Sequence, residues 1–166
     1  MNKGIVKKEV SRIIETLEGE AKRNHFKGGI FKLIELNNKE KVSVLQILQY
    51  LGIEAREDEN FILTDLTQTM KPTMEFDLDY ELRRYANSLP NVEEIRQNSN
   101  EHMEQVINRH VAHIIMEIHN YELLGKHKAI FKKSEYLNKR LRDGIIDELS
   151  NYYEVTIEGV EIHVAF

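Results

Sequence analysis

Histidines gather in one stretch of the chain, where their spacing could seat a metal ion. Five of the seven lie between residues 102 and 127, and His110, His113 and Glu117 would lie within about 60° of one another on a helix. A zinc or iron site needs ligands that converge from at least two elements, and no other segment offers a His or carboxylate pair at ligand spacing. We therefore expect no metal and no cofactor, with His110 in the core and His113 and Glu117 facing solvent.

Carboxylates alternate with apolar residues between Pro72 and Pro90. The acidic residues of this pattern are Glu75, Asp77, Asp79 and Glu81. On a strand they would share one face about 6.5 to 7 Å apart, where like charges repel, so the face would favour a cation. The cation could be a magnesium ion, although such sites draw carboxylates from several elements. The alternatives are a charged edge strand that resists aggregation, or pairing with a basic protein surface such as segment 126–142, within one subunit or between two.

A basic segment follows in the last third of the chain. Its cations are Lys126, Lys128, Lys132, Lys133, Lys139, Arg140 and Arg142. Together with Phe131 and Tyr136 they could bind nucleic-acid phosphates. However, the segment lacks a helix-turn-helix or RNP pattern, and a solvated helix face explains such a run equally well. The net charge of −5 gives the whole chain no attraction for nucleic acid or an anionic membrane.

Several classes of function find no support in the residues. The chain has no cysteine, which excludes disulfides, thiolate metal sites and thiol catalysis. It contains no GxSxG, Walker A, GxGxxG or kinase signature, so the sequence does not support enzyme activity. No apolar run approaches the roughly 20 residues that span a bilayer. We therefore expect a cytoplasmic protein that does not bind membranes.

The apolar periodicity predicts an α+β fold of amphipathic helices packed on short antiparallel hairpins. The predicted helices cover 6–21, 42–51, 79–89, 92–123 and 134–149, and the predicted strands cover 30–34, 53–55, 61–63, 74–80, 129–131, 153–157 and 160–166. The third helix competes with the strand at 74–80 and takes over near residue 79, and Asn98-Ser99-Asn100 could interrupt the fourth helix. Gly52 is expected to cap the second helix, Asn91 and Glu94 to form a capping box, and Ser134 to cap the last helix. The final hairpin turns at Glu158-Gly159.

The two ends of the chain share the order helix, strand, helix, hairpin. Ile30-Phe31-Lys32 in the first half is echoed by Ile130-Phe131-Lys132 in the second. The echo indicates either an internal repeat or a chance recurrence of a common order. A repeat predicts an N-terminal lobe 1–64, an acidic connector 65–91 and a C-terminal lobe 92–166, and the alternative is one compact domain.

Residues 145–164, IIDELSNYYEVTIEGVEIHV, resemble the helix-plus-hairpin ending of many small structural or host-interacting proteins of tailed bacteriophages. The resemblance covers only this part of the chain. It implies a non-enzymatic protein that binds other proteins and associates with itself, in a virion or in the host cytoplasm. Two alternatives remain open. One is a nucleic-acid-associated regulatory protein that uses segment 126–142, and the other is a metal-dependent hydrolase that uses the acidic strand or the histidines.

Overall fold

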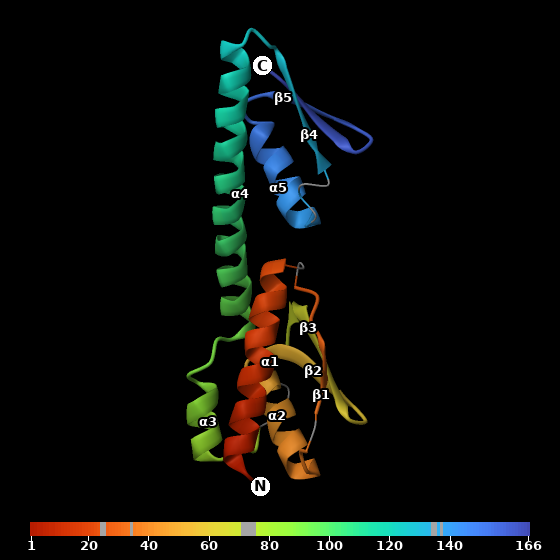
Figure 1. Cartoon of the computed structure of the whole chain (residues 1–166). Coiled ribbons are helices and arrows are strands. Elements are labelled where there is room, and N and C mark those ends of the chain that lie inside the picture. The colour runs from red at the N-terminus through yellow and green to blue at the C-terminus, as the bar shows by residue number, and fades with distance from the viewer. Residues whose placement is uncertain (24–25, 34, 71–75, 134–135, 137) are drawn as a thin grey trace. The chain divides into compact units, whose positions relative to one another are not determined.

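The computed structural model describes residues 1–23, 26–33, 35–70, 76–133, 136 and 138–166 (Figure 1). These residues form helices and two antiparallel sheets, which confirms the predicted α+β class. The chain divides into two compact units, Met1–Asn100 (unit 1) and Glu101–Phe166 (unit 2). Each unit has its own hydrophobic core.

Unit 1 packs helices against one face of a three-stranded sheet with the strand order β1-β3-β2. Its elements are α1 (Lys3–Arg23), β1 (Ile30–Lys32), α2 (Asn38–Tyr50), β2 (Ile53–Asp58), β3 (Phe61–Thr69), α3 (Tyr80–Ala86) and the start of α4 (Val92–Leu123). The apolar stripe of α1 is buried as its period predicts. The expected glycine cap of α2 is confirmed, because Gly52 follows the helix with a φ of +79°.

Unit 2 repeats this arrangement with the rest of α4 and four further elements. They are β4 (Lys128–Lys132), α5 (Lys139–Leu149), β5 (Glu154–Glu158) and β6 (Glu161–Ala165). The strand order is β4-β6-β5, and the final hairpin turns at the predicted position. Helices α4 and α5 approach closely at Gly144, where an added Cβ would lie 2.3 Å from Cδ1 of Ile107. Unit 2 therefore has little room for a larger side chain between these helices.

The two units share more than the order of their elements. In unit 1, Phe31 on the edge strand is paired with Ile62 on the central strand, and in unit 2 Phe131 is paired with Ile162 in the same way. The residue after each edge strand, Leu33 or Lys133, donates its backbone N–H to the hairpin turn over the same 2.8 Å. Both halves of the chain thus build the same topology in the same register.

The predicted strand at 74–80 is wrong for the part that the structure describes. Residues 76–79 belong to no strand, and Asp79 is the N-cap of α3, where its carboxylate accepts the N–H of Leu82 at 3.0 Å. The helix that was predicted to take over near residue 79 is confirmed, because α3 begins at Tyr80, directly after the Asp79 cap. Residues 74 and 75 lie outside the described residues.

Two other boundaries differ from the sequence predictions. Ser134, the expected N-cap of the last helix, lies outside the described residues, and Asn138 caps α5 instead. The segment 65–91, treated above as a connector, contains the end of β3 and all of α3. The contact-based division of the chain lies at Asn100, within α4.

Candidate interaction surfaces

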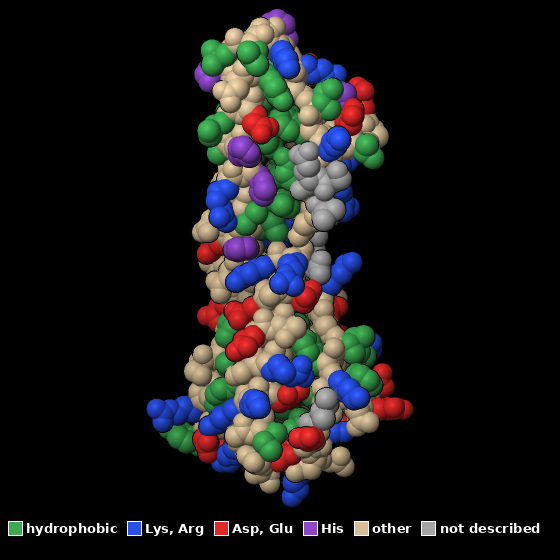
Figure 2. Space-filling model, viewed as in Figure 1, with side chains coloured by type: hydrophobic (Ala, Val, Ile, Leu, Met, Phe, Trp, Pro, Cys, Tyr) green, Lys and Arg blue, Asp and Glu red, His purple; other side chains and the backbone are tan. Residues whose placement is uncertain are grey.

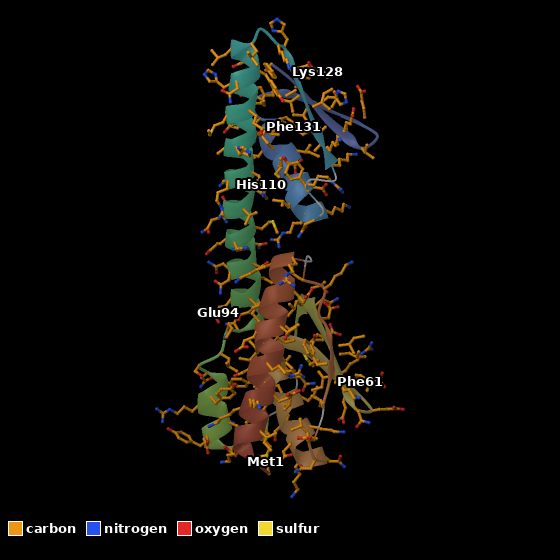
Figure 3. The ribbon with its side chains drawn as sticks, in the orientation of Figure 1. Met1, Phe61, Glu94, His110, Lys128 and Phe131 are labelled. Carbon is orange, nitrogen blue, oxygen red and sulfur yellow. The ribbon has the colours of Figure 1, made fainter. Side chains whose placement is uncertain are left out.

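The sheet of unit 2 has one covered face and one outward face. Ala129, Phe131, Ile162 and Val164 belong to the core with α4 and α5, and Phe131 points toward the helices in Figure 3. Because side chains alternate along strands, the other set faces outward. This outward set, the unit 2 sheet surface, consists of Lys128, Ile130, Lys132, Glu154, Thr156, Glu158, Glu161, His163 and Ala165.

Charge on the unit 2 sheet surface is separated by strand. Edge strand β4 contributes Lys128 and Lys132, whereas edge strand β5 contributes Glu154 and Glu158, and all four side chains are exposed. Ile130 lies between the two lysines and is 53% exposed. Figure 2 shows basic, acidic and hydrophobic side chains next to one another over the strands of this unit. One edge is therefore basic and the other acidic.

His163 lies at the centre of this surface, between Ile130 and Thr156 in the strand register. Only 6% of the residue is exposed. Its Nε2 atom lies 3.1 Å from a carboxylate oxygen of Glu161 and 3.6 Å from one of Glu158. Its Nδ1 atom has no hydrogen-bond partner among the residues that the structure describes.

Sequence reasoning missed His163. The alternation of 160–166 places it opposite the core, which suggests solvent exposure. Its burial comes from its position on the central strand, between two neighbours. The pairing order of the strands was the missing information.

The sheet of unit 1 has an equivalent outward face, the unit 1 sheet surface. Its members are Ile30, Lys32, Glu54, Arg56, Asp58, Phe61, Leu63 and Asp65. The face is more apolar near β1, because Ile30 is 71% exposed and Leu63 stands beside it in the register. Phe61 lies at the tip of the hairpin (Figure 3). Both units therefore expose an isoleucine at the same place on the edge strand.

Two of the three candidate metal ligands, His113 and Glu117, contact each other, whereas His110 packs against an aromatic ring. His113 Nε2 is 3.5 Å from Glu117 Oε1, and both side chains are exposed. His110 is half-buried, not a core residue, and its ring packs edge-on against Tyr136 at a centroid distance of 5.6 Å. Within the described parts of the chain, no three His, Asp or Glu side chains come together as a metal site would require.

The acidic residues pair within unit 1. Lys3 Nζ lies 3.0 Å from Asp79 and 3.2 Å from Glu81, and Lys7 Nζ lies 2.5 Å from Glu81. Hydrogen bonds from Lys7 and then Lys3 lower the pKa of Glu81. The N–H of Leu82 and then Lys3 lower the pKa of Asp79. Within the single chain, the basic partners of Asp79 and Glu81 thus come from α1, whereas one of the alternatives above took them from segment 126–142.

The expected acidic face has two further residues, Asp77 and Glu75. Asp77 is exposed. Glu75 lies outside the described residues.

The cations of the basic segment are distributed over β4, α5 and the residues that flank β4. Lys128 and Lys132 face outward from β4, and Lys133 donates to the backbone carbonyl of Gly159 at 2.7 Å. Lys126 Nζ lies 4.7 Å from the ring centroid of Tyr121. The remaining cations, Lys139, Arg140 and Arg142, lie in the first turn of α5. Burial lowers the pKa of Arg140.

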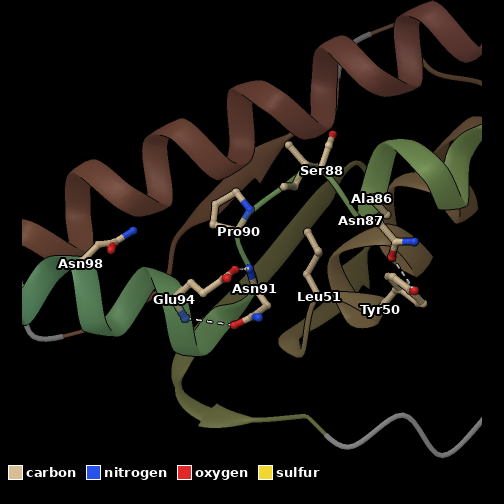
Figure 4. Close-up of a pocket in the computed structure, with 10 residues that line it drawn as sticks. Tyr50, Leu51, Ala86, Asn87, Ser88, Pro90, Asn91, Glu94 and Asn98 are labelled. Atoms are coloured by element: carbon tan, nitrogen blue, oxygen red, sulfur yellow. Dashed lines mark hydrogen bonds between the residues drawn. The ribbon is translucent and has the colours of Figure 1, made fainter.

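Unit 1 has a pocket with a volume of about 650 Å³ (Figure 4). Most of its polar side chains form hydrogen bonds to nearby residues. Asn91 accepts the N–H of Glu94 at 3.0 Å and donates its own N–H to the Glu94 carboxylate at 2.8 Å, which confirms the predicted capping box. Tyr50 donates its hydroxyl hydrogen to Asn87 at 2.7 Å.

Across the described ranges, no helix has both the length and the apolar character needed to cross a membrane. Comparison of the chain with protein-family models, with curated proteins and with solved structures finds no match.

Proposed function

We propose that this chain is a non-enzymatic assembly protein that binds protein surfaces, including its own, through the outward faces of its two sheets. The observation that carries the proposal is the exposure of Ile30 and Ile130 at equivalent positions on the two edge strands. Apolar side chains grouped with polar neighbours on an outward face are typical of protein-binding sites.

The edge strands add a second kind of support. An edge strand presents unpaired backbone N–H and C=O groups that can pair with another chain. Strands β1, β2, β4 and β5 are the edges of the two sheets. Near β5 the exposed apolar residues Ile157 and Val160 accompany these groups. Such a combination favours contact with another protein over contact with water.

The place of assembly that we propose follows from the resemblance of residues 145–164 to phage proteins. We therefore propose a virion or the host cytoplasm as the compartment.

The direct test is the molar mass by light scattering, measured from about 10 μM to 1 mM protein at low and high salt. Self-association predicts a mass above the 19.6 kDa of one chain that rises with protein concentration. A mass of one chain under every condition would contradict self-association.

A further inference from the structure

The charges of the unit 2 sheet surface are arranged for self-complementarity. Along the register, Lys128 stands in one row with Ala165 and Glu154. Four residues away along each strand, Lys132 stands in one row with Glu161 and Glu158. Each of these rows therefore runs from a lysine on β4 to a glutamate on β5.

A two-fold axis parallel to β6 exploits this arrangement when two such faces meet. Rotation about that axis keeps each row at its own height and exchanges the two edges. Lys128 then faces Glu154 of the second copy, Lys132 faces Glu158 of the second copy, and each contact occurs twice. Ile130 faces Thr156 of the second copy, and the lysine stems beside it can cover its side chain.

The other in-plane axis, perpendicular to the strands, gives the opposite result. It places β4 over β4 and β5 over β5, so that lysines face lysines and glutamates face glutamates. Like charges at contact distance disfavour that arrangement. The charge pattern thus selects one of the two orientations.

We propose that two copies of this chain associate through the unit 2 sheet surface about a two-fold axis parallel to β6. This inference rests on the proposed function and names the surface and the partner. His163 and Glu161 lie on the axis, and each meets its own counterpart. The Glu161 carboxylate is turned toward His163 in the single chain, which lessens the repulsion between the two copies of Glu161.

The size of the face sets the strength of the association. Its strands span about 10 Å across and 14 Å along their length. This is smaller than the roughly 800 Å² per partner that stable complexes bury. We therefore expect a dissociation constant of about 10 μM or weaker, which rises about tenfold between low and high salt because exposed ion pairs are screened.

Charge reversal on each edge provides the test. One variant carries Lys128→Glu with Lys132→Glu, and the other carries Glu154→Lys with Glu158→Lys. Light scattering should find each variant alone as single chains, because all facing charges are then alike. An equimolar mixture should form dimers again, because every glutamate of one variant then faces a lysine of the other. The chain with all four reversals should also dimerise.

A matched control reverses Lys8 and Lys22, which are exposed on α1. The Lys8→Glu, Lys22→Glu chain has the same net charge as the first variant and should dimerise like the wild type. Circular dichroism of all variants verifies folding. If the mixture of the two variants forms dimers, pairing of unit 2 with unit 1 of another copy is also excluded. The charges of unit 1 are unchanged in both variants, so mixing them could not restore such a contact.

The outcomes separate this inference from the proposed function. If the wild-type chain associates and both reversal variants associate equally well, the unit 2 sheet surface is not the interface, and the assembly function stands. If each variant is a single chain and mixing restores nothing, the two-fold arrangement is wrong. A wild-type chain that never associates overturns both the interface and self-association.

Discussion

Gly28 lies where the chain enters β1 and passes closest to the backbone of β3. An added Cβ would lie 1.7 Å from the carbonyl oxygen of Thr64 and 2.3 Å from its carbon, and neither backbone atom can turn away as a side chain could. Gly28→Ala must therefore displace β1 or β3. We expect it to lower the free energy of unfolding of unit 1 by about 2 kcal/mol or more, measured by urea denaturation.

Gly19 offers a control with the same substitution. It lies inside α1, where an added Cβ meets no atom within 4 Å. Alanine is favoured over glycine in a helix by about 1 kcal/mol, so Gly19→Ala should stabilise the chain. Equal effects of the two substitutions would mean that the close approach at Gly28 does not constrain the fold.

His163 shows how position decides the environment of a single residue. An imidazole opposite the core would normally be solvated, yet the register of β6 between β4 and β5 buries it. The carboxylate of Glu161 compensates Nε2 alone. Among the described residues, the buried Nδ1 atom has no hydrogen-bond partner. Such an atom lowers the stability of the fold unless another group forms a hydrogen bond with it. The proposed two-fold contact would place a second imidazole beside it.

At the scale of elements, the spacing of apolar residues was sufficient to predict a helix or strand wherever one face of that element is buried. The stripe of α1, the length of α4 and the final hairpin follow from the spacing of apolar residues alone. Local capping signals were equally informative at Asn91 and Gly52. In each case the decisive interactions lie within a few residues along the chain.

The strand predicted at 74–80 failed because the decisive interactions are distant in sequence. Phe76, Leu78 and Tyr80 alternate with carboxylates, which is the period of a strand. The partners of those carboxylates, Lys3 and Lys7, lie more than 70 positions away. Once α1 supplies these cations, the carboxylates are favoured at the start of a helix, with Asp79 as the N-cap and Glu81 in the first turn, where the helix dipole also attracts them.

The ion pairs between α1 and the start of α3 imply that the stability of unit 1 depends on pH. The pKa values of Asp79 and Glu81 are lower in the folded chain than their ordinary values. A carboxyl group with a lowered folded pKa contributes stability above its unfolded value, near pH 4, and loses it as pH falls through the folded value. We therefore expect urea denaturation to show the stability of unit 1 falling below about pH 4.

Neutral variants isolate this contribution. Asp79→Asn with Glu81→Gln keeps a side chain that can cap α3 and removes both charges. This chain should be less stable than the wild type at pH 7, and the difference should shrink toward pH 3. Asp77→Asn, at an exposed position of the same segment, should behave as the wild type does. A difference that stays constant with pH would contradict the ion pairs.

At the scale of the whole molecule, one topology serves two different surfaces. The cores are equivalent, with a phenylalanine on the edge strand paired with an isoleucine on the central strand in each unit. The outward faces diverge: unit 1 presents Ile30, Leu63 and Phe61, whereas unit 2 presents separated charges around His163. The interior side chains are alike in the two units, so the difference between the units lies in their outward side chains.

Separate cores imply separate local stabilities. Ile62 and Ile162 occupy the same position on the two central strands, and at most 1% of either residue is exposed. Removing one methylene from each by Ile62→Val and Ile162→Val should cost about 1 kcal/mol. Native-state hydrogen exchange should then show faster exchange of the β3 amides in the first variant and of the β6 amides in the second. Equal acceleration in both sheets by either substitution would mean that the chain opens as one cooperative unit, despite its two cores.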